Sequence, residues 1–138
     1  MSVDLVNNPQ HYSAFGFESL ELLEKVFELM PEKNIIFYIG NALKYTIRSK
    51  FKGSEILDLK KCEFYIKKCK NYTSEDFKML ESKEIMSFLT KISNKDFKLF
   101  LLINDIIHFA LNPSQRNYNA VENHIKNILE RGYKNENI

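Results

Sequence analysis

The scarcity of helix-breaking residues is the feature that most constrains what this chain can fold into. Its 138 residues include only four glycines and three prolines. Between these breaks, apolar residues recur at steps of three and four, which is the spacing of an amphipathic helix. No segment shows the strict apolar–polar alternation with flanking turns that marks a strand. We therefore expect an all-α protein, a small bundle of about six helices with an extended N-terminal arm.

Breaks and capping residues predict where each helix begins and ends. Residues 1–16 should form the arm. We expect helices over residues 17–30, 33–50 and 54–71, followed by short helical pieces up to residue 92. A further helix should span residues 95–111 after a cap at Ser93 or Asn94, and a last amphipathic helix should end at Gly132. The turn 51–54 should join the second and third helices as an antiparallel hairpin. At this length we expect a single domain over residues 1–138.

Composition narrows the class of partner. The chain is 44% hydrophobic and 28% charged, with a net charge of +2, which is a globular profile. Duplex DNA is not expected as a partner, because duplex binders usually carry a larger, clustered basic excess. A small anionic ligand held by a few local cations is more compatible with this net charge than duplex DNA is. No signal peptide is visible and the apolar runs are too short to cross a bilayer, so we expect a cytoplasmic protein with no membrane partner.

The two cysteines are expected to be buried, reduced thiols. Cys62 and Cys69 lie seven positions apart on one predicted helix, which separates them by about 10 Å along its axis. A disulfide needs Cα atoms within roughly 7 Å, so these two cannot pair within the helix.

The second predicted helix carries a polar stripe on an otherwise apolar segment. Asn41, Lys44 and Arg48 are spaced by three and four residues and share one face. One interpretation is an anion site, with Lys44 and Arg48 on phosphate oxygens and Asn41 on a base or sugar. The alternative is a solvated helix face, with Gly40 allowing close helix packing. An exposed stripe contributes little to folding, so replacing either cation should leave thermal stability almost unchanged.

Two pairs of acids could serve as a metal site. Glu18 and Glu21 open the first predicted helix, and Glu55 and Asp58 open the third. Each pair is spaced by three residues, and such carboxylates from two helices can hold Mg²⁺. The alternative is that acids simply favour the first turn of a helix through its dipole. We therefore expect Mg²⁺ as a cofactor only if the two pairs of acids form a metal site.

The N-terminal arm is rich in hydrogen-bonding and aromatic side chains, among them Asn7, His11 and Tyr12. His11 could contact phosphate or act as an acid or base near neutral pH. The chain has no G-x-x-x-x-G-K-[ST] sequence, which excludes an ordinary P-loop kinase.

An ordered set of residues resembles a known family. The set begins with Val6-Asn7-x-Pro9-x-His11-Tyr12 and Phe17-Glu18. It continues with Phe37-x-x-Gly40-Asn41-Ala42-Leu43-Lys44-Tyr45-x-x-Arg48, then Lys52-Gly53 and Asp58-Leu59-Lys60-Lys61-x-x-x-Tyr65. Together they resemble the short phage-encoded SaV-like or nucleotide kinase-like family, of which one podovirus member is a deoxynucleoside monophosphate kinase. The resemblance covers about residues 5–68, and residues 72–138 would be additional C-terminal helices.

The resemblance implies a nucleotide-binding phage protein acting in the infected host cell, with a kinase-like phosphotransferase activity. Lys44, Arg48 and Lys52 would neutralise phosphates, and Asn41 and Tyr45 would orient the base or sugar. The arm residues Asn7, His11 and Tyr12 would lie beside them, and His11 or Asp58 would assist proton transfer. Phosphoryl transfer is mostly positioning and charge neutralisation, which such residues can supply.

Two other classes of function stay open. A Mg²⁺-dependent nucleotide pyrophosphohydrolase would use the four acids around the metal. A non-enzymatic protein would sequester a nucleotide signal or inhibit a host protein through its C-terminal helices. In every case we expect a homo-oligomer, because the second and fifth helices carry more apolar surface than a small bundle can hide.

Overall fold

The computed structural model describes residues 19–50, 55–75 and 82–131. They form α1 (Ser19–Leu29), η2 (Lys33–Ile35), α2 (Ile36–Arg48), α3 (Glu55–Lys68), η3 (Cys69–Tyr72), α4 (Lys83–Lys95), α5 (Phe97–Leu111) and α6 (Gln115–Arg131). In these ranges there is no strand, and one isolated bridge pairs Ser74 with Ser114. The expected all-α fold is confirmed, and none of the described helices is long and apolar enough to cross a membrane.

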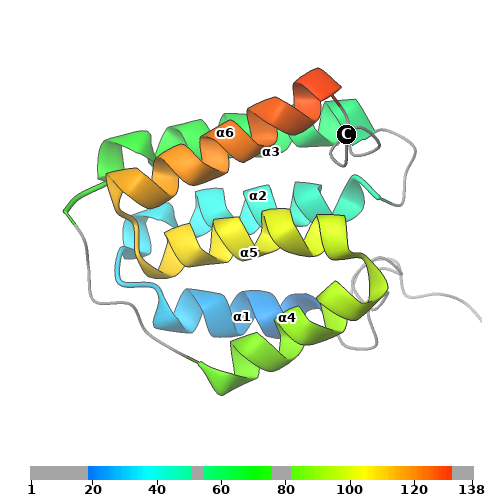
Figure 1. Ribbon diagram of the computed structural model, residues 1–138. Helices are drawn as coiled ribbons and strands as arrows, with labels where there is room; N and C mark the ends of the chain where they lie inside the picture. Colours follow the sequence, from blue (N-terminus) through cyan, green and yellow to red (C-terminus); the bar gives the residue numbers. More distant parts are fainter. Residues whose placement is uncertain (1–18, 51–54, 76–81, 132–138) are drawn as a thin grey trace, which may run out of the picture.

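The helices lie in two layers of three (Figure 1). One layer holds α1, α2 and α3, and α4, α5 and α6 lie over it in the same order, so that α1 packs on α4, α2 on α5, and α3 on α6. The most extensive contact in the molecule is between α2 and α3. These two helices run antiparallel, as the sequence predicted, while the turn 51–54 lies outside the described residues.

Apolar side chains fill the space between the layers. α5 is the most buried helix, because residues on nearly all its sides face either α2, α4 or α6. Phe109 of α5 and Tyr118 of α6 meet edge-on with ring centroids 5.9 Å apart, and both are buried. Cys62 and Cys69 are free and buried as expected, and burial raises the pKa of each thiol to about 12.

The largest error in the predicted helix boundaries lies at the junction of α4 and α5. Instead of short pieces, residues 83–95 form one helix, capped by Ser82, whose hydroxyl accepts a hydrogen bond from the Ile85 amide at 3.2 Å. The next helix is capped by Asp96 and not by Ser93 or Asn94: the Asp96 carboxylate accepts from the Leu99 amide at 3.0 Å. Ser, Asn and Asp are all good N-caps, so propensity alone could not choose between them.

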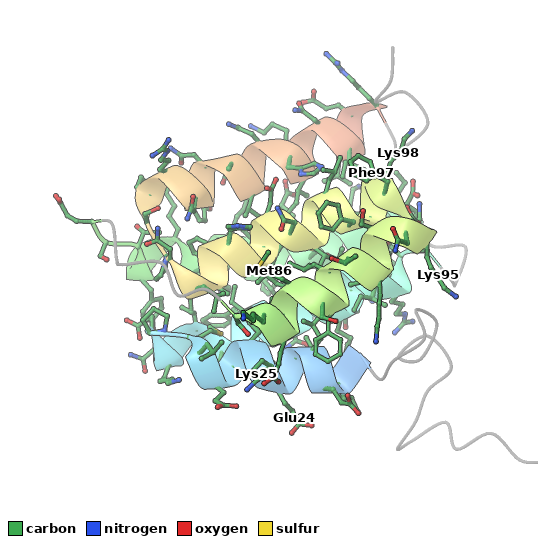
Figure 2. All side chains as sticks on the ribbon, turned by 60° about the horizontal axis from the view of Figure 1, so that its bottom comes forward. Glu24, Lys25, Met86, Lys95, Phe97 and Lys98 are labelled. Atoms are coloured by element: carbon green, nitrogen blue, oxygen red, sulfur yellow. The ribbon has the colours of Figure 1, made fainter. Side chains whose placement is uncertain are left out.

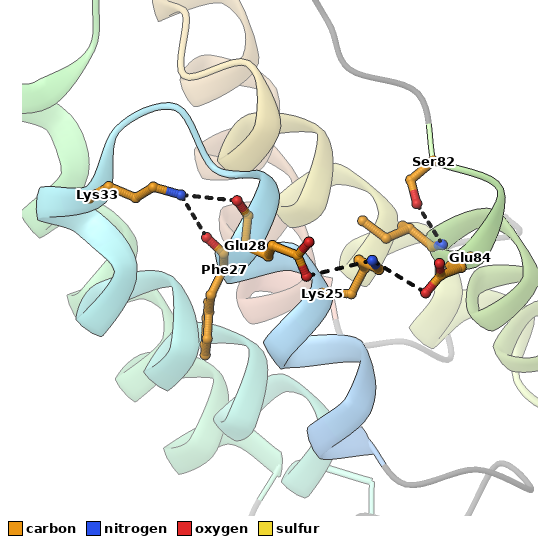
Figure 3. A network of polar contacts seen from close by, with 7 residues as sticks. Lys25, Phe27, Glu28, Lys33, Ser82 and Glu84 are labelled. Atoms are coloured by element: carbon orange, nitrogen blue, oxygen red, sulfur yellow. Dashed lines mark hydrogen bonds and ion pairs between the residues drawn. The ribbon is translucent and has the colours of Figure 1, made fainter.

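Polar contacts fix α1 against α4 and close the turn that follows α1 (Figure 3). Lys25 forms ion pairs with Glu28 at 3.5 Å and with Glu84 of α4 at 3.4 Å. Burial alone would lower the pKa of Lys25, but these two carboxylates raise it above its ordinary value. After the turn at Pro31, the Lys33 ammonium donates to the carbonyls of Phe27 and Glu28, both at 3.1 Å. A cation on the last carbonyls of a helix is a favourable C-terminal cap.

Gly40 is explained by packing between α1 and α2. A Cβ atom at this position would lie 2.9 Å from the Cζ atom of Phe27, closer than real Cβ contacts. The Phe27 ring therefore occupies the space above the glycine. This observation supports the packing explanation for a glycine in mid-helix, in place of close approach by a ligand.

Gly40→Ala is expected to give no gain in stability, because the clash with Phe27 offsets the roughly 1 kcal/mol that alanine gains over glycine in a helix. In a Phe27→Leu background, where the ring is gone, the same substitution should stabilise the protein by about 0.5–1 kcal/mol. Urea unfolding of the four proteins in this double-mutant cycle measures the difference. An equal effect of Gly40→Ala in both backgrounds would contradict the packing explanation.

Candidate functional site

Basic and aromatic side chains share the outer face of the α2–α3 hairpin. We call this surface the cation–aromatic face. It consists of Phe37, Asn41, Lys44, Tyr45 and Arg48 from α2, and Lys61, Phe64, Tyr65 and Lys68 from α3. In each helix these residues recur at steps of three and four, so each set forms one stripe. The hairpin brings the two stripes together.

The Tyr45 ring lies at the centre of this face. The Lys44 ammonium is 4.8 Å from the ring centroid, the Lys61 ammonium is 5.1 Å from it, and the Arg48 Cζ atom is 6.0 Å from it. Tyr65 stacks on the same ring, with centroids 6.1 Å apart and planes 7° from parallel. Three cations from two helices therefore converge on one aromatic ring, each within the range of a cation–π interaction.

Lys44 and Lys61 differ from Arg48 in their acidic partners. Within the described ranges, neither lysine forms an ion pair with a carboxylate. Arg48 does: its Nε atom lies 3.8 Å from Oδ1 of Asp58, whose side chain is only 1% exposed. The two lysine ammonium groups can therefore interact with solvent or a ligand, whereas the Arg48 guanidinium already forms an ion pair within the protein.

This pairing changes the interpretation of two predicted site residues. Asp58 is buried beside Arg48, so a carboxylate expected to assist proton transfer or hold Mg²⁺ instead lies in the interface between α2 and α3. The contact also leads us to expect that replacing Arg48 lowers stability, in contrast to the prediction made from sequence. Removing Arg48 takes one ion-pair partner away from a buried carboxylate, and that is destabilising.

Asn41 lies one turn before Tyr45 on the same stripe. Its side-chain amide donates a hydrogen bond to the Phe37 carbonyl at 2.9 Å. The amide oxygen makes no hydrogen bond to any other described residue and can accept one from a ligand. Phe37 itself is 66% exposed, and its ring meets Tyr65 edge-on at a centroid distance of 6.0 Å.

Several residues proposed from sequence fall elsewhere. Asn7, His11, Tyr12, Glu18 and Lys52 lie outside the described residues. Glu21 is exposed on α1, and Glu55 begins α3. Among residues 19–50, 55–75 and 82–131, no group of three or more His, Cys, Asp or Glu side chains could hold a metal ion.

The α3 half of the face was missed by reasoning from sequence. Lys61, Phe64, Tyr65 and Lys68 recur at steps of three and four, which is the same signal that singled out the stripe on α2. Only the packing of the hairpin shows that both stripes face the same side, because a single amphipathic pattern does not say which neighbour a helix will have.

A hollow of about 450 Å³ between α4 and α5 is chemically different from this face. Its walls are mainly apolar and include Met86 of α4, which is labelled in Figure 2. Among the described residues, its polar lining includes Asn104 and His108 and no Lys, Arg, Asp or Glu side chain. The His108 Nδ1 atom lies 2.8 Å from the Asn104 carbonyl oxygen. The described part of the cation–aromatic face brings several cations together, so it is the better candidate for an anionic ligand.

Comparison with known families corrects the expected identity. Residues 6–72 match the model of a family described as a protein of unknown function (DUF3310). No kinase-like family is indicated, so the resemblance to a nucleotide kinase-like family is wrong. No significant match was found among curated proteins or among solved structures. The matched segment ends at the last residue of η3, so it contains both helices of the cation–aromatic face and none of α4–α6.

Proposed function

We propose that the cation–aromatic face binds a nucleotide, with the phosphate between Lys44 and Lys61. The observation that carries this proposal is the convergence of these two ammonium groups on the Tyr45 ring without a carboxylate partner in the described part of the chain. Two like charges so placed repel each other, and a bound anion would replace that repulsion with attraction to both. The phosphate group of a nucleotide supplies such an anion.

The base would lie against the exposed Phe37 ring, beside Tyr65. An aromatic side chain stacks on a base through its π-face whatever the base is. From this position the base edge could donate to the Asn41 amide oxygen. Arg48, held by Asp58, would add a third positive charge near the phosphate without being its main ligand.

Phosphoryl transfer between nucleotides is the activity that we propose for this site, because it depends mainly on positioning and on charge neutralisation. The described cations can provide both. A nucleotide-binding protein of this kind would act in the cytoplasm, where its ligands are found. Asp58 would serve as a positioning residue for Arg48 and not as the proton acceptor, since it is buried beneath that side chain.

Titration calorimetry with deoxynucleoside monophosphates at low salt tests binding, and chromatography of nucleotide mixtures tests chemistry. We expect nucleotide binding to weaken as the salt concentration rises. Inorganic phosphate should compete with the nucleotide. New diphosphate would support phosphoryl transfer. Released pyrophosphate would indicate a hydrolase instead, and unchanged but retained nucleotide would indicate a binding protein. Absence of binding to any nucleotide would overturn the proposal. Light scattering of the same sample tests the predicted homo-oligomer.

A further inference from the structure

We infer that the nucleotide site is one end of a longer site, and that its ligand is a single-stranded oligonucleotide. This inference rests on the proposed function. It adds a second, separate observation: the cation–aromatic face extends along α3 past the Tyr45 cluster. Lys68 and Phe64 form another cation–aromatic pair there, with the ammonium 5.0 Å from the ring centroid.

The two clusters are joined by a continuous series of rings. Tyr65 stacks on Tyr45, meets Phe37 edge-on at 6.0 Å, and meets Phe64 edge-on at 5.2 Å. Phe37 and Phe64 are the most exposed of the four, at 66% and 54%. These two exposed rings are apolar surfaces on which an unstacked base could lie.

The spacing of the lysines favours a ligand with more than one phosphate. Lys61 and Lys68 are seven residues apart on α3, which places their Cα atoms about 10 Å apart along the helix axis. In the structure the two ammonium groups lie over different rings, Lys61 over Tyr45 and Lys68 over Phe64, so each is placed to meet a separate phosphate. A chain of nucleotides carries a phosphate at every step and can contact each lysine separately.

The alternation of rings and cations is the pattern by which proteins bind single strands. Unstacked bases lie on aromatic side chains while lysines follow the phosphates, and the binding is tolerant of sequence. A duplex offers no unstacked bases to these rings. It would also require a larger basic excess than the net charge of +2 provides.

A length series tests the inference. Binding of dTMP, dTTP and oligothymidylates of two, four and eight nucleotides would be measured by calorimetry for the parent, Phe64→Ala and Lys60→Ala. We expect the tetranucleotide to bind at least tenfold more tightly than dTMP. It should also bind more tightly than dTTP, which carries comparable charge but only one base. Phe64→Ala should weaken tetranucleotide binding by roughly five- to a hundredfold, since that is the range for losing one stacked base.

Phe64→Ala should leave mononucleotide binding unaffected. The control Lys60→Ala should bind ligands of every length like the parent, because Lys60 is exposed on α3 and forms no contact with the Tyr45 ring. If dTMP binds but length brings no gain over dTTP, the oligonucleotide inference is overturned and the nucleotide site stands. Equal loss of mononucleotide and oligonucleotide affinity in Phe64→Ala would likewise refute the longer site. If no member of the series binds, both proposals fail.

Discussion

Replacing Lys44 and Lys61 together by alanine is expected to weaken nucleotide binding by about a hundredfold or more. A charge-assisted hydrogen bond contributes about 1.5–3 kcal/mol, and the double variant removes two of them. The lower part of that range applies, because both lysines are partly exposed to solvent and their interactions are screened. Calorimetry at low salt measures the loss. The unfolding temperature should change little, since neither lysine has an ion pair with a described carboxylate to lose.

A matched control separates a site from a general effect of charge. Lys60 on α3 and Lys126 on α6 are exposed and lie away from the Tyr45 ring. The Lys60→Ala/Lys126→Ala protein loses the same total charge as the test variant, and we expect it to bind nucleotide within about twofold of the parent. If both double variants lost affinity equally, binding would reflect net charge alone. If the Lys44/Lys61 variant bound like the parent, the ligand would not lie between these lysines.

Arg48→Ala is expected to lower the free energy of unfolding by about 2–3 kcal/mol, because it leaves the buried Asp58 carboxylate without the guanidinium beside it. This is less than a fully buried pair would lose, since Arg48 is itself 37% exposed. The melting temperature should fall by roughly 6–12 °C, which thermal unfolding followed by circular dichroism measures. Lys44→Ala, on the same helix face, should melt close to the parent.

Neutralising the partner distinguishes the ion pair from simple loss of packing. Asp58→Asn keeps the size of the side chain and removes its charge. In the Asp58→Asn background, Arg48→Ala should lower the free energy of unfolding much less than it does in the parent, because the side chain at position 58 then carries no charge for the guanidinium to stabilise. If Arg48→Ala lowers the free energy of unfolding equally in both backgrounds, the aliphatic part of the arginine stabilises the hairpin and the ion pair does not.

Periodicity and helix breakers were sufficient to predict the fold class. Amphipathic spacing is local, and it identified α1, α2, α3, α5 and α6 with ends close to those observed. The α4–α5 junction was harder because three adequate capping residues, Ser93, Asn94 and Asp96, follow one another closely. Which of them caps α5 depends on where α4 must end to turn back over the second layer, and that is decided by contacts between helices.

By itself, the sequence determined that the chain is helical, that Cys62 and Cys69 are buried thiols, and that Lys44 and Arg48 share one face of α2. These properties depend on neighbours within one or two helical turns. The tertiary structure alone decided that Lys61 joins Lys44 at the Tyr45 ring and that Arg48 covers a buried acid. Both depend on how α2 and α3 align in the hairpin, and that alignment is set by the packing of apolar surfaces that are separate in the chain.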